Sequence, residues 1–205
     1  MMDVVSLFVF AEKFVRDKGY GWEIDWCDKR PSFDTVDAQR FLSEFAWVVY
    51  NSGMKNSVIE SKWAGLTKAY EDFDADMIVR SESKVRSSVL GIFGNRRKLD
   101  SVIRVAKMVH YYGYELMKLR IKKDPLNYLV SLPYIGDITK HHLARNLGFD
   151  HVKPDRHLVR LADKYGMTPF QLCQQIHEVT NRRIGAIDVI LWRFMEQKGL
   201  EEIEE

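Results

Sequence analysis

Cysteine is scarce in this chain of 205 residues, which contains only Cys27 and Cys173, far apart in the sequence. A disulfide framework, a four-cysteine zinc site and an iron–sulfur cluster all need more thiols than two. The sequence therefore excludes these classes, and we expect neither a metal nor another cofactor. Such cysteine usage suits a reducing compartment, so we expect a cytoplasmic location.

Long apolar runs are also missing, because no stretch reaches the length that crosses a membrane. The first residues, MMDVVSLFVFAEKF, contain a short apolar run, but Asp3 precedes it, Glu12 and Lys13 end it, and no small-residue cleavage site follows. We therefore expect no signal peptide and no membrane partner. With 5 prolines and 12 glycines, the chain does not have the composition of a low-complexity protein.

Net charge is small: 31 basic and 29 acidic residues give +2, so the overall charge does not identify a partner. The distribution is more informative, because basic residues gather in segments 83–107 and 117–123, whereas the tail EEIEE is acidic. These basic segments are either solvated helix faces or surfaces that bind an anion.

The chain has what a folded core needs, since 46% of it is hydrophobic and 12% is aromatic. The apolar spacing is mostly helical, which predicts an all-α fold of about ten short helices. We interpret residues 20–34 as a connection with aromatic anchors. The expected helices are an N-terminal one ending before Gly19 and those near 35–49, 57–71, 75–80, 83–90, 97–111, 125–131, 137–146, 155–165, 169–179 and 185–197.

A tight turn in the segment LPYIGDIT joins two of the predicted helices. Pro133 restricts the backbone before it, and we expect Gly136 to permit the reversal that starts a helix at Asp137 or Ile138. The first backbone N–H groups of that helix have no acceptor within it, so they can bind an anion such as a DNA phosphate. On this pattern alone, an ordinary αα-hairpin without an anion is the favoured interpretation.

A carboxylate stands at the start of the next predicted helix, where Asp155 follows Pro154. It can serve as a helix cap, because it accepts unpaired N–H groups and suits the helix dipole. The same position favours an ionised carboxylate that could stabilise a developing positive charge. Further along, we expect Asp188 to cap the start of the last helix rather than to act as a second catalytic acid.

Several segments together resemble the helix-hairpin-helix DNA glycosylase superfamily, typified by endonuclease III. The hairpin LPYIG, its following helix and Asp155 carry the resemblance. Upstream, FLSEFAWVVYNSGMKNSV is similar to that family's helix and loop before the strand-invading turn, and VLGIFGNRRKLDSVIRVAKMV is similar to its wedge loop and following helix. The likeness covers about residues 38–165, in the order of the family.

The resemblance implies a single helical domain with two lobes around a central cleft. One lobe, resembling a six-helix barrel and carrying the wedge loops, would span about 35–120; the other would join 1–34 with 121–205, and the helix-hairpin-helix motif would occupy about 125–147. The implied partner is double-stranded DNA with one base flipped out, bound by a monomer in a bacterial or phage-infected cell, in the cytoplasm or with the nucleoid.

The resemblance also implies site residues. Asp155 would be the catalytic carboxylate. The hairpin would hold a DNA phosphate through Tyr134, Gly136, Ile138 and Thr139. The wedge loops would contact DNA through Asn51, Ser52, Asn95, Arg96 and Arg97. Residues that could reach the base or a phosphate are His142, Arg156 and Arg160, although either arginine could instead pair with a carboxylate.

The chain departs from the family pattern at two hairpin positions. Bifunctional members have a lysine where this chain has Ile138, which cannot form a Schiff base, so lyase chemistry through that residue is excluded. Tyr134 replaces the glycine that is usual at the third position of the hairpin. We therefore expect a monofunctional DNA glycosylase. The alternatives are a glycosylase-fold transferase, like the phage enzymes that attach amino acids to activated thymine, and a DNA-binding module without catalysis.

Overall fold

A computed structural model of the chain describes residues 2–29, 32–198 and 201. Helices account for 79% of the residues, and the described part of the chain contains no strand, so the all-α prediction is confirmed. Thirteen α-helices are present in these residues, more than the ten or so that we expected. None of them is both long and apolar enough to span a membrane.

Two of the additional helices lie where the sequence pattern is weak. Residues 20–34 are not a simple connection, because Gly21–Asp28 forms α2, which buries only Ile24 and Cys27 and therefore shows little apolar periodicity. Helix α8, Tyr114–Lys123, begins directly after Gly113, whose φ of 78° ends the preceding helix. The charged sequence of α8 conceals its buried side, which comprises Tyr114, Met117 and Ile121.

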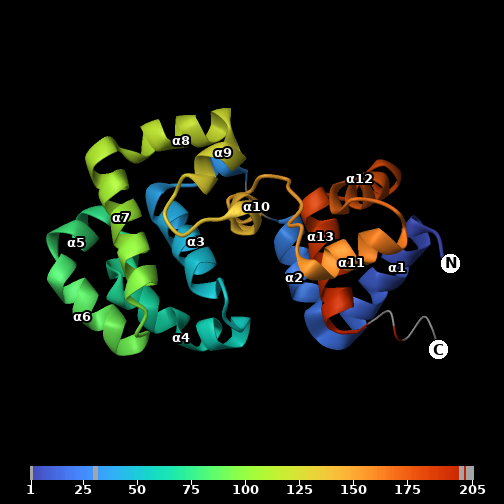
Figure 1. Ribbon diagram of the computed structural model, residues 1–205, viewed down its shortest axis with the longest axis horizontal. Helices are drawn as coiled ribbons and strands as arrows, with labels where there is room; N and C mark the ends of the chain where they lie inside the picture. Colours follow the sequence, from blue (N-terminus) through green and yellow to red (C-terminus); the bar gives the residue numbers. More distant parts are fainter. Residues whose placement is uncertain (1, 30–31, 199–200, 202–205) are drawn as a thin grey trace. The chain divides into compact units, whose positions relative to one another are not determined.

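Contacts between Cα atoms divide the chain into two compact units (Figure 1). The terminal unit comprises the described residues of Met1–Ser32 and Gly148–Glu205, and the central unit is Phe33–Leu147. The segment 121–147 belongs to the central unit, whereas we expected it to join the chain ends. The reason is local packing, because α9, Pro125–Val130, contacts α8, and α10, Asp137–Asn146, contacts both α9 and the long helix α3.

The terminal unit is built from both ends of the chain. Figure 1 shows α1 and α13 side by side, coloured from opposite ends of the sequence. Their shared core includes Phe14 and Phe194, whose rings meet edge to face at 5.3 Å between centroids. After Val15 the chain bends through Arg16–Tyr20, where Gly19 has a φ of 89°, before α2 begins. The α-helices of this unit are α1, Val4–Val15; α2, Gly21–Asp28; α11, Arg156–Lys164; α12, Pro169–Thr180; and α13, Ile184–Glu196.

The central unit packs around α3 and α7, which contact each other. Phe41 and Phe45 of α3 and Val102 of α7 are fully buried, and the buried hydroxyls of Tyr50 and Tyr70 hydrogen-bond to each other at 2.8 Å. A short 3₁₀ turn occurs at Phe33–Thr35, and Glu71–Phe73 forms a turn in the left-handed region, with φ angles of 50°, 53° and 61°. The α-helices are α3, Ala38–Asn51; α4, Asn56–Ala69; α5, Ala75–Arg80; α6, Glu82–Ile92; α7, Arg96–Tyr112; α8, Tyr114–Lys123; α9, Pro125–Val130; and α10, Asp137–Asn146.

Candidate functional site

The hairpin between α9 and α10 turns at Tyr134, not at Gly136. Tyr134 has a φ of 70°, in the left-handed region, whereas Gly136 is extended, with φ −112° and ψ −174°, and is the N-cap residue of α10. Our expectation that Gly136 makes the reversal is therefore wrong. A left-handed conformation is costly for a side chain with a Cβ atom, so the turn keeps Tyr134 in a conformation that glycine adopts more readily.

The start of α10 leaves room for a ligand. A Cβ atom added at Gly136 would meet nothing within 4 Å, so neither packing nor φ requires glycine there. The Gly136 N–H donates to the Thr139 hydroxyl at 2.8 Å, and Thr139 therefore acts as part of the cap. The N–H groups of Asp137 and Ile138 have no acceptor within the helix, and they are the ones that can bind a phosphate.

The acidic side chain at this helix start is balanced by a neighbour. The Lys140 ammonium donates to the Asp137 carboxylate at 2.8 Å, and this hydrogen bond lowers the pKa of Asp137. Lys140 therefore folds back toward the first turn of α10 while Ile138 stays exposed. The ion pair reduces the repulsion that Asp137 would otherwise exert on an approaching anion.

Lys98 is a buried cation that holds the end of α3. Only 2% of Lys98 is exposed, and its ammonium donates to the carbonyls of Val49, Tyr50 and Ser52 at 2.8, 2.7 and 2.6 Å. These carbonyls lie at the C-terminus of α3, where helix geometry leaves acceptors unpaired and a cation is favourable. Burial lowers the pKa of Lys98 to about 8.

Lys98 belongs to the basic segment 83–107, and we did not expect a buried cation there. A signal was present, because Lys98 precedes Val102 and Val105 at helical spacing on the side of α7 that turned out to be buried. The structure also explains how the loop is anchored, since the Asn95 side chain accepts the Lys98 N–H at 3.2 Å and caps α7.

Lys98 brings the expected wedge loops and the hairpin together within the central unit. Its ammonium lies 5.6 Å from the centre of the Tyr134 ring while it binds the Ser52 carbonyl. The Asn51 carboxamide, which we expected to contact DNA, donates to the Trp47 carbonyl at 3.0 Å, an acceptor in its own helix. Three separate sequence segments, at 49–52, 95–98 and 134, thus meet around one ammonium group.

Arg96 and Arg97 stand exposed at the positive end of α7. The first turn of this helix has no acidic residue, and neither arginine makes an ion pair with the residues that the structure describes. A cation at a helix N-terminus is repelled by the positive end of the helix dipole, at a cost of about 0.3–1 kcal/mol. A bound anion would offset this repulsion. Their position therefore favours an anionic ligand.

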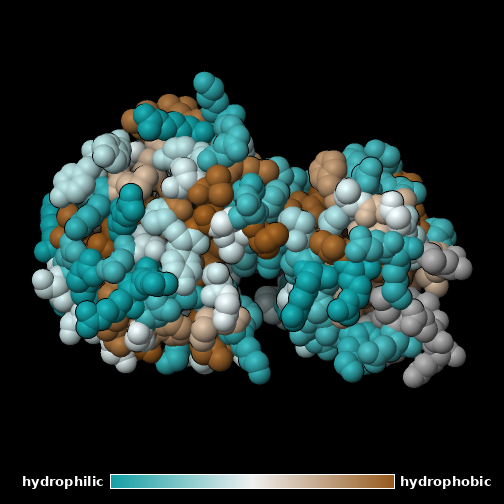
Figure 2. Space-filling model, viewed as in Figure 1, coloured by the Kyte–Doolittle hydropathy of each residue, from teal (hydrophilic) through white to brown (hydrophobic). Residues whose placement is uncertain are grey.

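The second basic segment, 117–123, has a more structural role. The Lys118 ammonium donates to the carbonyls of Asp34 and Val36 at 2.7 and 2.8 Å, and Lys122 pairs with the Asp34 carboxylate. Apolar atoms lie among the polar ones over α8 in Figure 2, where Leu116 and Leu119 are exposed. This helix thus uses two of its cations to bind the chain that precedes α3.

Asp155 is the N-cap residue of α11 in the terminal unit, so the cap interpretation is confirmed. Its Oδ1 accepts the N–H groups of His157 and Leu158 at 3.0 and 3.1 Å. The residue is half-buried, and no described residue donates to its second oxygen, Oδ2. The cap therefore orients the carboxylate through one oxygen and leaves the other available to a ligand.

The connection that carries Asp155 is held to α13 at two points. Asp150 accepts the N–H groups of Ile184 and Gly185 at 3.2 and 2.8 Å, and the Asp188 carboxylate accepts the Lys153 N–H at 3.1 Å. The Lys153 carbonyl in turn accepts the Asp155 N–H at 2.7 Å. Two carboxylates thus link the backbone leading to Asp155 to the last helix.

Asp188 is not the helix cap that we expected. Helix α13 begins at Ile184, its N-cap residue is Arg183, and Asp188 lies one turn inside with 1% of its surface exposed. The sequence cannot reveal this, because the partner of Asp188 is a backbone amide 35 residues away. Burial and the nearby charges of Asp188 and Asp150 raise the pKa of the Cys173 thiol, and burial lowers the pKa of His151.

The remaining candidates occupy separate positions. His142 is half-buried on α10 in the central unit. In the terminal unit, the Arg156 Nε donates to His157 Nε2 at 3.3 Å, and Arg160 is exposed with no ion pair among the described residues. Among those residues, no three His, Cys, Asp or Glu side chains lie close enough to hold a metal ion.

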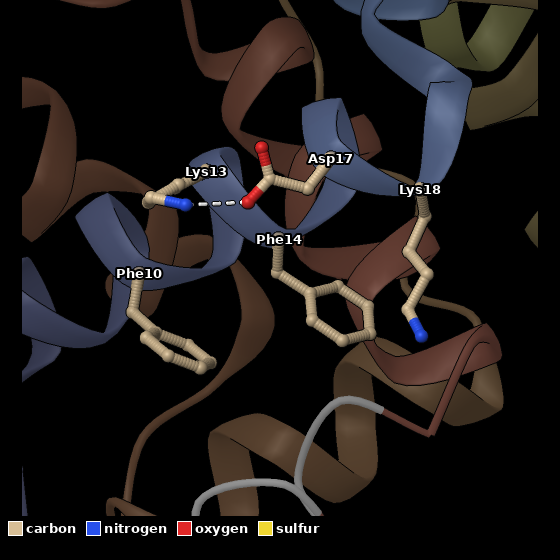
Figure 3. A pocket seen from close by; sticks show the side chains of 5 residues that line it. All are labelled: Phe10, Lys13, Phe14, Asp17 and Lys18. Atoms are coloured by element: carbon tan, nitrogen blue, oxygen red, sulfur yellow. Dashed lines mark hydrogen bonds and ion pairs between the residues drawn. The ribbon is translucent and has the colours of Figure 1, made fainter.

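A pocket of about 350 Å³ lies along α1 and the turn after it (Figure 3). Its walls are Phe10, Lys13, Phe14, Asp17 and Lys18. The lysines already have partners, because Lys13 pairs with Asp17 at 2.5 Å and the Lys18 ammonium lies 5.1 Å from the Phe14 ring centre. None of the predicted site residues lines this pocket, and we assign it no role in the candidate site.

Comparisons with family models, with curated proteins and with solved structures found no match to this chain. The resemblance to helix-hairpin-helix glycosylases therefore depends on the sequence motifs quoted above and stays a prediction. The structure adds the geometry of the hairpin, of the Lys98 cluster and of the Asp155 cap.

Proposed function

We propose that this chain is a DNA base-processing enzyme, a monofunctional glycosylase that hydrolyses the bond between a flipped modified or mismatched base and its sugar. One observation carries the proposal: Asp155 is a half-buried carboxylate with Oδ1 held by two N–H groups and Oδ2 free of donors among the described residues. Asp155 lies at the N-terminus of α11, where the helix dipole is positive. A fixed anion of this kind stabilises a positive charge that develops in a transition state.

In the proposed reaction the bond between C1′ of the sugar and the base nitrogen breaks, and its electron pair leaves with the base. Positive charge develops on the sugar ring, and the Asp155 carboxylate stabilises it. Water then attacks C1′, and its proton passes to Asp155 and from there to the departing base or to solvent. The products are the free base and an abasic site.

DNA binding is supported by groups of the central unit. The first N–H groups of α10 suit a phosphate, the space beside Gly136 allows a strand to approach closely, and Arg96 and Arg97 supply exposed positive charge. Lys98 holds the loop at Ser52 and lies beneath the hairpin tyrosine. The binding groups are thereby fixed in place before DNA arrives, which lowers the entropy cost of binding.

The chemistry at the hairpin favours hydrolysis over a covalent intermediate. Ile138 is 46% exposed at the position where bifunctional relatives of the resembled family carry a lysine. An isoleucine has no nucleophile, so no Schiff base with the sugar forms there. Water is then the nucleophile that attacks C1′. The enzyme would leave the DNA backbone intact at the abasic site.

The experiment is mass spectrometry of an oligonucleotide panel after incubation with the purified chain. Duplexes containing uracil, hydroxymethyluracil, oxidised guanine or alkylated adenine are suitable substrates. Loss of one base mass from one member, with no strand cleavage before alkali, is the expected result. A gain of mass in the presence of an amine and an activated base would indicate group transfer, and unchanged mass across a bound panel would indicate a binding module.

A further inference from the structure

We propose that Tyr134 is a stacking platform for an unpaired nucleobase of the strand whose phosphate binds at the start of α10. The inference deepens the proposed function and depends on it, because it takes DNA as the ligand of the central unit. The hairpin was expected to bind only a phosphate of the DNA backbone, and the proposal adds a contact with a base.

The first observation is that the ring is available. Tyr134 is 40% exposed although it is aromatic, and Ile138, four residues further along the chain in the first turn of α10, is 46% exposed. The hairpin therefore exposes two large apolar side chains close in sequence to the N–H groups that suit a phosphate. A nucleotide offers the matching chemistry, because it joins a flat apolar base to an anionic phosphate.

The second observation is the cation beneath the ring. The Lys98 ammonium lies 5.6 Å from the ring centre and is itself fixed by the carbonyls of Val49, Tyr50 and Ser52. A cation near the ring attracts its π electrons and holds its orientation. The ring thus has a charged partner inside the protein and additional surface open to solvent, which is the arrangement of a stacking platform.

The third observation concerns the backbone conformation of Tyr134. Tyr134 keeps a φ of 70°, a conformation that glycine would adopt at lower cost. The left-handed turn gives no reason for a tyrosine, and the exposed ring adds little to the core. The turn conformation therefore does not account for an aromatic side chain at this position.

The test uses the full chain and a duplex with one unpaired 2-aminopurine, a fluorescent base whose emission falls when it stacks. We expect wild-type protein to bind and to quench the fluorescence. Tyr134→Gly should weaken binding about tenfold and abolish quenching, whereas Tyr134→Phe should bind within about twofold of wild type. The melting temperature of Tyr134→Gly should stay within about 3 °C of wild type, because relief of the backbone offsets the lost ring contact.

Tyr112→Ala is the matched control, because Tyr112 is 68% exposed in the same unit. It should change neither affinity nor quenching. Equal affinity and quenching in wild type and Tyr134→Gly would overturn the stacking proposal even if base release is normal. Binding and quenching without base release from any substrate would overturn the glycosylase proposal and support stacking, and absence of DNA binding by the wild type would overturn both.

Discussion

The ammonium of Lys98 lies 5.6 Å from the centre of the Tyr134 ring, and it also donates to three carbonyls at the end of α3. This relationship links a hairpin near residue 134 to a helix end near residue 50, through the first turn of a third helix. The end of α3, the first turn of α7 and the hairpin, where we propose that the central unit contacts DNA, therefore meet at one ammonium group.

Removal of the Lys98 ammonium should destabilise the central unit. In Lys98→Met the carbonyls of Val49, Tyr50 and Ser52 lose their donor, and we expect a loss of about 2–4 kcal/mol in the free energy of unfolding, measured in urea at pH 7. Lys118→Met is the control, because its ammonium also binds two carbonyls but is only half-buried. Similar losses in the two variants would show that burial of Lys98 has no special effect.

Stability should depend on pH through the same group. The folded chain releases the Lys98 proton near pH 8, whereas the unfolded chain keeps it to the ordinary value of 10.5. Between these values the unfolded state binds more protons, so stability should rise with pH by up to about 1.4 kcal/mol per unit. The measurement is the unfolding free energy of wild type minus that of Lys98→Met between pH 8 and 9.5. A difference that stays flat or falls over this range would contradict the assignment.

Arg96 and Arg97 should contribute to DNA affinity without contributing to stability. Replacing either residue by alanine should weaken binding and reduce the slope of log affinity against log salt by about 1, while the free energy of unfolding stays equal or rises slightly. Arg104→Ala is the control, since Arg104 is exposed two turns further along α7. A salt slope that responds equally to all three variants would argue against a defined contact at the helix start.

Asp188 should hold the backbone that leads to Asp155. In Asp188→Ala the Lys153 N–H loses its buried acceptor, and we expect faster hydrogen exchange at Lys153 together with a loss of about 1–3 kcal/mol in stability. Asp188→Asn keeps an acceptor oxygen and should preserve most of the protection. If the Lys153 amide is equally protected in Asp188→Ala, the carboxylate does not position this connection.

The fold class and most helices could be predicted because they depend on local patterns. The cap of α11 at Asp155 follows from Pro154, a carboxylate and a helical apolar pattern in sequence. The left-handed residue of the hairpin was assigned to Gly136, although Tyr134 stands where the resembled family usually has glycine. The geometry of the whole turn determines which residue takes the left-handed conformation. The presence of a glycine therefore did not identify that residue in this hairpin.

The roles of Lys98 and Asp188 could not be predicted because their partners are backbone groups distant in sequence. Every residue has a backbone carbonyl, and nearly every residue has a backbone N–H group, so residue types do not indicate which of these groups bind Lys98 or Asp188. The sequence also does not show whether a charged side chain is buried. Helix α2 was missed for a different reason, since its exposed Trp22 and Trp26 conceal the apolar pattern of its buried side.

The most direct measurement is the rate of base release by Asp155→Asn relative to wild type on the substrate found in the oligonucleotide panel. Asparagine also caps helices, so folding and DNA affinity should be kept while the rate falls at least about 100-fold. Asp3→Asn is the matched control, because Asp3 caps α1 in the same unit with Oδ1 accepting two N–H groups at 3.0 Å, and it should retain the full rate. Equal rates for Asp155→Asn and wild type would contradict the proposal that Asp155 is the catalytic carboxylate.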